Sequence, residues 1–218
     1  MIQAEGIFAG GATKPYIEET YGSDGNLIDV KLHGYTKIRD NAFSNCYYLS
    51  LTSLPDEIVS IGSGAFNGCE SITLTILPDG ITSIETSAFS GCTNLALTNL
   101  PSGITHIGTY AFYGCANLAL TSLPDGLTSI GGYAFGGCYN MTLTSIPSGV
   151  TSIGMRSFVV CNGLTLLTFM GTPTSIASNA FLGCENLTTI NVPWAEGAVE
   201  GAPWGATNAT INYNYTGG

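Results

Sequence analysis

The sequence is poor in charge, and above all in basic residues. Only five of its 218 residues are lysine or arginine, against fifteen aspartates and glutamates, which gives a formal net charge of -10. Four of the basic residues precede residue 40, and Arg156 is the only one after it. Because there is no basic stripe, we expect neither nucleic acid nor an anionic membrane surface as a partner. The acidic excess is expected to serve solubility.

Long apolar runs are missing as well. No stretch approaches the roughly 18 apolar residues of a membrane helix, so no membrane insertion is expected. Met1 to Gly11 lacks the basic region and the apolar core of a secretory signal, so no signal peptide is visible. The chain is nevertheless 44% apolar and only 9% charged. This composition indicates a folded protein, because disorder goes with few apolar residues and high charge.

Groups that could carry chemistry are scarce. There are two histidines, His33 and His106, and neither has a partner pattern around it. The serines show no nucleophile elbow, and the Gly-Gly pairs lack the Gly-Lys-Ser/Thr of a phosphate loop. No C-x-x-C pair suggests a metal site. We therefore expect no enzymatic activity, no metal and no cofactor.

What the sequence does contain is a strict repeat. Each cysteine follows the previous one by 23 residues, with a phenylalanine three residues before it and an isoleucine eight before it; the cysteines are Cys46, Cys69, Cys92, Cys115, Cys138, Cys161 and Cys184. A fixed period without insertions predicts stacked coils of a solenoid. We expect an N-terminal cap over residues 1–26, the repeat array over 27–192, and a C-terminal cap over 193–218. In that last segment Trp194 and Trp204 are expected to cover the core of the final coil.

The cysteine count is odd, and every cysteine occupies the same place in its coil. Secreted disulfide scaffolds have even counts and irregular spacing, so buried free thiols are the preferred interpretation. Equivalent positions on adjacent coils lie about 5 Å apart, which is near disulfide reach. Disulfides along the row of cysteines therefore remain an alternative.

Each coil is predicted to contain a leucine-bearing strand, a Pro-x-Gly turn, a second short β segment such as Ile81 to Ile84, and a helical or 3₁₀ turn such as Ala88 to Cys92. Interior coils place apolar residues three, five and eight positions after the cysteine, whereas the last coil places them at three, six and eight. Because side chains alternate in a strand, either the interior strands contain a bulge or one leucine of each coil is exposed. The stripe of exposed leucines would comprise Leu51, Leu74, Leu97, Leu120, Leu143 and Leu166. We favour the bulge, because such a stripe promotes aggregation.

The unit I-G-x-x-A-F-x-x-C-x-x-L, followed by a Leu-Pro turn, resembles the bacterial leucine-rich repeat of the BspA type. It recurs in seven coils between Leu27 and Val192, and one coil matches at Ile130, Ala134, Phe135, Cys138, Met141, Ile146 and Pro147. The resemblance implies a mainly β repeat solenoid, a right-handed leucine-rich-repeat superhelix of 23-residue coils with short strands, turns and 3₁₀ or helical turns. It also implies a non-enzymatic role in adhesion or protein binding, at the cell surface or outside the cell.

The candidate binding residues are aromatic. Tyr110 and Tyr133 occupy one slot in successive coils, and Tyr113 and Tyr139 lie on the same segment nearby. Tyrosine offers a large contact area and loses little rotamer entropy on binding, so these four residues are the expected binding site. The alternative is that they only shield one edge of the solenoid.

Two functions follow from these observations. One is a module that binds a protein or glycan of a host or neighbouring cell. The other is a structural spacer in a cell-surface or prophage tail-like assembly, in which the repeats supply length and stiffness.

Overall fold

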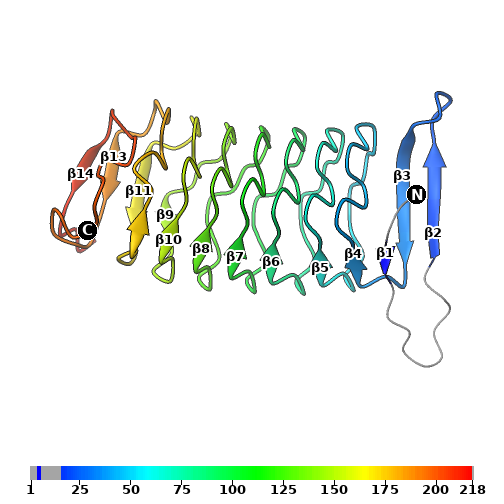
Figure 1. Cartoon of the computed structure of the whole chain (residues 1–218), viewed down its shortest axis with the longest axis horizontal. Helices are drawn as coiled ribbons and strands as arrows, with labels where there is room; N and C mark the ends of the chain where they lie inside the picture. The colour runs from blue at the N-terminus through cyan, green and yellow to red at the C-terminus, as the bar shows by residue number, and fades with distance from the viewer. Residues whose placement is uncertain (1–3, 6–15, 218) are drawn as a thin grey trace.

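The computed structural model describes residues 4–5 and 16–217 and shows one elongated stack of coils (Figure 1). Residues 1–3, 6–15 and 218 lie outside this description; they include half of the expected N-terminal cap and most of the segment Met1 to Gly11. The described residues form strands and turns without any helix. The predicted fold class, a mainly β solenoid of 23-residue coils, is confirmed.

A ladder of two-residue strands runs along one side of the stack. Equivalent residues pair in parallel, as in Ile107 with Ile130, and each strand ends on a buried isoleucine. This confirms the predicted second β segment. The strands are β4 (Lys37–Ile38), β5 (Ser60–Ile61), β6 (Ser83–Ile84), β7 (His106–Ile107), β8 (Ser129–Ile130), β10 (Ser152–Ile153) and β12 (Ser175–Ile176). They form two sheets, β1-β4-β5 and β12-β10-β8-β7-β6, and β1 (Ala4–Glu5) joins β4 antiparallel.

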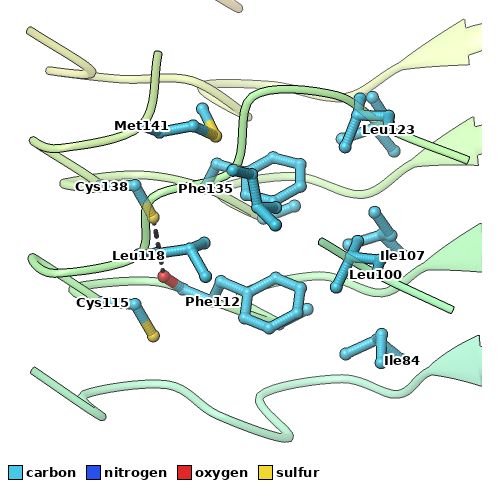
Figure 2. Close-up of a cluster of buried hydrophobic side chains, with 14 of the residues drawn as sticks. Ile84, Leu100, Ile107, Phe112, Cys115, Leu118, Leu123, Phe135, Cys138 and Met141 are labelled. Atoms are coloured by element: carbon cyan, nitrogen blue, oxygen red, sulfur yellow. Dashed lines mark hydrogen bonds between the residues drawn. The ribbon is translucent and has the colours of Figure 1, made fainter. Parts of the chain in front are cut away.

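Phenylalanines and cysteines form two rows inside the stack (Figure 2). The phenylalanine rings of adjacent coils lie parallel, with centroids 5.1 to 5.6 Å apart. Each thiol from Cys69 to Cys184 donates to the phenylalanine carbonyl 26 residues earlier, at 2.9 to 3.2 Å. All seven cysteines are free, so the alternative of disulfides along the row is wrong.

The segment between the isoleucine and the cysteine turns without becoming helical. Alternate amides bond within it, as from Cys92 N to Phe89 O at 3.1 Å, and the amides between them bond to the next coil, as from Phe89 N to Ala111 O at 2.9 Å. The predicted 3₁₀-type turn is therefore present as isolated i→i−3 bonds, without a continuous helical run. The glycine before the cysteine has a positive φ, as expected, at Gly91, Gly114, Gly137 and Gly183.

The predicted leucine strands are absent from the coils between β3 (Leu27–His33) and β9 (Ser145–Ile146). The leucine five places after the cysteine nevertheless points inward: Leu51, Leu74, Leu97, Leu120 and Leu143 are buried, and only Leu166 is exposed. The prediction of a stripe of exposed leucines is thus wrong. The favoured prediction of a bulge is also wrong, because a bulge needs a strand around it and these coils have none. Apolar residues at spacings of two and then three cannot all face inward from an extended strand. The backbone therefore leaves the extended conformation between them.

Longer strands occur at the two ends of the stack. At the N-terminal end β2 (Tyr16–Tyr21) and β3 form an antiparallel hairpin. At the other end β11 (Leu166–Phe169), β13 (Thr189–Asn191) and β14 (Thr210–Asn212) form a parallel sheet with β9, in the order β14-β13-β11-β9. In these later coils the inward residues are spaced by two, as at Leu167 and Phe169, so an extended strand satisfies them. Trp194 and Trp204 are buried beside Phe169, with ring centroids 5.3 and 6.1 Å from it.

Candidate functional site

Three of the four candidate tyrosines form one cluster. The rings of Tyr110 and Tyr133 stack with centroids 4.7 Å apart and an interplanar angle of 11°. Tyr113 meets both rings edge-on, at 5.5 and 6.1 Å. Tyr110 and Tyr113 are exposed, and Tyr133 is half-buried. These three residues, called the tyrosine patch below, present a continuous aromatic surface across two coils.

Tyr139 lies apart from the patch. It is 50% exposed. Among the described residues, no ring contact links it to the other three tyrosines. The structure therefore brings together Tyr110, Tyr113 and Tyr133 and leaves Tyr139 as a separate exposed side chain.

The backbone under the patch is in a conformation that tyrosine rarely adopts. Tyr110 and Tyr133 both have φ of 57°, in the left-handed region. Other coils place Gly64 or Ser87 in this slot, with φ of 62° and 55°. A side chain with a Cβ costs about 1–2 kcal/mol there, so the scaffold itself gains nothing from a tyrosine in this position. The free energy that compensates this cost must come from the ring stacking or from the groups that the rings contact.

Arg156 extends the column of the two stacked rings, since it stands 23 residues after Tyr133. Its Nη1 donates to the Tyr133 hydroxyl at 2.9 Å, and its guanidinium carbon lies 5.8 Å from the centroid of that ring. It is also the only basic residue beyond residue 40. Sequence reasoning did not include Arg156 in the site, although its spacing from Tyr133 was a visible signal.

A glycine makes room for the Tyr113 ring. A Cβ at Gly136 would lie 2.9 Å from Tyr113 Cδ2 and 2.8 Å from Val159 Cγ1. Because Gly136 has no side chain, Tyr113 and Val159 both approach it closely from the coils on either side. The absence of a side chain at Gly136 is therefore a condition for this position of the Tyr113 ring.

The two histidines lie on different strands, His106 on β7 and His33 on β3. His106 is exposed on β7, with Nδ1 2.6 Å from Ser129 Oγ of the next coil. His33 stacks on Tyr16 at 4.3 Å and lies 3.4 Å from a Glu18 oxygen. Among the described residues no three His, Cys, Asp or Glu side chains form a group that could hold a metal ion.

Burial also keeps the inner thiols unreactive. It raises the pKa of Cys69 to about 12 and that of Cys184 to about 11. Burial raises the pKa of Cys92, Cys138 and Cys161 well above the usual value of a thiol. Since the thiolate is the nucleophile and the metal ligand, these side chains act as core residues at neutral pH.

The repeat geometry has a counterpart among known families. The family described as BspA type leucine rich repeat region matches the chain over residues 18–142 and 97–195, in six copies. The chain belongs to the BspA-type leucine-rich repeat family. No helix in its described part is long and apolar enough to cross a bilayer.

Two solved leucine-rich repeat structures resemble this member of the BspA-type family. A leucine-rich repeat protein of T. pallidum is 26% identical, with a TM-score of 0.60, over 81% of each chain. A leucine-rich cell surface protein of Faecalibacterium prausnitzii A2-165 is 25% identical, with a TM-score of 0.64, over 84% of this chain and 56% of its own length. A search of curated proteins found no significant match. The family and these structures show a leucine-rich repeat scaffold, a fold typical of protein-binding or surface modules.

Proposed function

We propose that this solenoid is a non-enzymatic binding module at a cell surface, and that it attaches to a protein or glycan of a host or neighbouring cell through the tyrosine patch. The observation that carries the proposal is the stacked pair at Tyr110 and Tyr133. Two tyrosines occupy a left-handed slot where other coils have asparagine, glycine, serine or arginine, and they remain accessible to a partner. Aromatic side chains and arginine are the residues that most often dominate binding energy.

The patch suits both partner classes. Flat tyrosine faces pack on the apolar faces of sugar rings and on apolar side chains, and their hydroxyls supply hydrogen bonds at the edge. Arg156 adds a cation beside the rings, held by its hydrogen bond to Tyr133. A cell-surface location fits the similarity to the F. prausnitzii protein, which is a cell surface protein.

The test is attachment of the purified chain to glycan and protein arrays, repeated with Tyr110→Ser plus Tyr133→Ser. Serine fits the backbone, because Ser87 already occupies the same slot with φ of 55°. Loss of two aromatic contacts is expected to weaken attachment by about tenfold or more. The melting temperature should move little, because the lost ring stacking is worth only about 0.5–1.5 kcal/mol.

The matched control is Tyr47→Ser plus Tyr48→Ser. These residues are 47% and 56% exposed on the first coil, away from the patch. The control removes as many exposed tyrosines and should leave attachment unchanged. If the Tyr110 and Tyr133 variant binds as tightly as the wild type, the tyrosine patch is not the binding site.

A structural spacer in a surface or tail-like assembly is the second candidate, and the unbroken period favours it. Seven phenylalanine rings stack without interruption from Phe43 to Phe181, which gives a stiff rod of fixed length. Deleting residues 70–92 removes one whole coil and no tyrosine, whereas deleting residues 116–138 removes one whole coil together with Tyr133.

The two deletions separate the candidate functions. A spacer loses the same length, about 5 Å, in both deletions, so assembly should respond to both alike. A binding module keeps its patch-dependent attachment after the first deletion and loses it after the second. Equal behaviour of the two deletions would therefore favour the spacer.

A further inference from the structure

The structure contains a groove that crosses several coils along their Leu-Pro turns. One hollow of about 540 Å³ lies between Asp56 and the segments 76–79 and 99–102. A second hollow of about 330 Å³ shares Asn99, Leu100 and Ser102 with the first and continues to Asp125. Together they form what we call the leucine–proline groove. No residue of the tyrosine patch lines it, so it is a separate surface.

The backbone along this groove is not paired with the neighbouring coils. In the described part of the chain, no hydrogen bond to an adjacent coil involves the amides of residues 75–77, 98–100 or 121–123. The last hydrogen bond between coils before the unpaired segment 75–77 runs from Ala96 N to Leu74 O, at 3.1 Å. Backbone amides and carbonyls must find partners, and here only solvent or a ligand can supply them. Successive coils therefore offer rows of backbone groups along the groove that a ligand can bond.

An apolar side chain projects into the groove from a position that is otherwise polar. Ile76 is 65% exposed and lines the larger hollow. The equivalent residues of the flanking coils are Ser53, Asn99 and Ser122. Beneath Ile76 the floor consists of buried leucine and proline side chains, such as Leu77 and Pro78. Ile76 thus gives the groove one apolar contact point that the repeat does not require.

The charge of the groove is uniformly negative. Asp56, Asp79 and Asp125 line it, and the sequence has no lysine or arginine between Arg39 and Arg156. Carboxylates without basic neighbours favour a cationic occupant and disfavour an anionic one. Their spacing along the stack suits several cationic side chains of one extended ligand.

We propose that the leucine–proline groove binds an extended peptide segment of a partner protein, with an apolar side chain next to lysine or arginine. The amides and carbonyls of the peptide pair with the open backbone of the coils, its apolar side chain packs on Ile76, and its basic side chains meet Asp56, Asp79 and Asp125. Backbone pairing supplies affinity, and the side-chain contacts supply selectivity. This site does not depend on the tyrosine patch.

Fluorescence polarisation with the full chain and a labelled peptide of alternating lysine and leucine tests the proposal. Ile76→Ser installs the residue found at Ser53 and Ser122 and is expected to weaken binding about fivefold through the lost apolar contact. Asp79→Ser installs the residue found at Ser102 and is expected to weaken binding about threefold, and less at high salt. The control Glu70→Thr removes the same charge from a residue outside the groove, as at Thr93, and should change affinity by less than either variant.

Hydrogen exchange of the same complex reports on the backbone. In the free protein the amides of residues 75–77 and 98–100 should exchange fast, and the peptide should slow them. The proposal is wrong if the peptide does not bind, if Ile76→Ser binds as tightly as the wild type, or if Glu70→Thr weakens binding as much as Asp79→Ser. It is also wrong if a neutral oligosaccharide, and not the peptide, slows exchange at these amides. The double variant Tyr110→Ser with Tyr133→Ser should leave peptide binding intact. The proposed groove and the proposed tyrosine patch can therefore be refuted separately.

Discussion

Raising the pH from about 8 to about 10 is expected to destabilise the folded chain strongly. Six cysteines, from Cys69 to Cys184, are buried, and burial raises the pKa of each thiol above 9.0, the usual value. In the unfolded chain the thiols ionise near that usual value. Stability from the neutral thiols is therefore complete below pH 9 and is lost as the pH rises toward the folded-state pKa values.

The magnitude follows from proton linkage. One pH unit above its unfolded-state pKa, each thiol that stays neutral in the fold lowers the free energy of unfolding by about 1.4 kcal/mol. Six such thiols give about 8 kcal/mol at pH 10, which is comparable with the whole stability of an ordinary domain. Even the least shifted of them, Cys184 with a pKa of about 11, is still neutral there.

Urea unfolding at both pH values, under reducing and oxygen-free conditions, measures this loss. Cys115→Ala should reduce the pH-dependent loss by about 1.4 kcal/mol, because one thiol is gone. Leu118→Ala is the matched control: it truncates another buried side chain of the same coil and should keep the full loss. Equal losses in the wild type and in Cys115→Ala would refute the linkage argument.

Three further predictions concern the core and the C-terminal end. Cys115→Ala should lower stability by about 2 kcal/mol at neutral pH, because it leaves a cavity and removes the thiol hydrogen bond; urea unfolding measures this loss, and ligand binding should not change. As a check on burial, thiol reagents should label half-buried Cys46 in the native protein. Rapid labelling of the other six cysteines would contradict their burial. Trp204→Ala should cost about 3–5 kcal/mol, because the side chain is fully buried and its Nε1 donates to Glu200 O at 2.7 Å; an unchanged thermal midpoint would contradict its packing role. Asn191→Leu should lower stability by about 0.5–1.5 kcal/mol, as chemical unfolding measures, because it removes the hydrogen bond from the Asn212 amide to Asn191 Oδ1 at 2.8 Å, and the exposed Asn212 amide can then bond to water; Asn208→Leu, at an exposed position, is the control.

The solenoid could be predicted because every coil repeats the same contacts. A single motif such as Ala134-Phe135 with Cys138 is weak, but seven copies at one spacing can only stack. The inward phenylalanines and cysteines and the positive φ of the glycine before the cysteine all follow from that spacing. The same logic indicated that Tyr110 and Tyr133 would be neighbours, and their rings do stack.

The backbone path between the anchors could not be predicted. Apolar residues three, five and eight places after the cysteine are compatible with a bulge, an exposed leucine or a loss of the strand. Only the hydrogen bonds of the structure show that the strand is lost. The groove around Ile76 is likewise visible only in the structure. The left-handed slot was equally hidden, because its occupants range from Gly64 and Ser87 to Tyr133 and share no side-chain property.

The thiol hydrogen bonds give the stack a direction. Each cysteine donates backward, to a carbonyl of the coil made before it; Cys138, for example, donates to Phe112 (Figure 2). A coil therefore obtains its last buried hydrogen bond only when the following coil has been added. During synthesis from the N-terminus, the newest coil is always the incomplete one, and every older coil is already closed. The array can thus grow vectorially, one coil at a time, with a single unfinished end facing the ribosome.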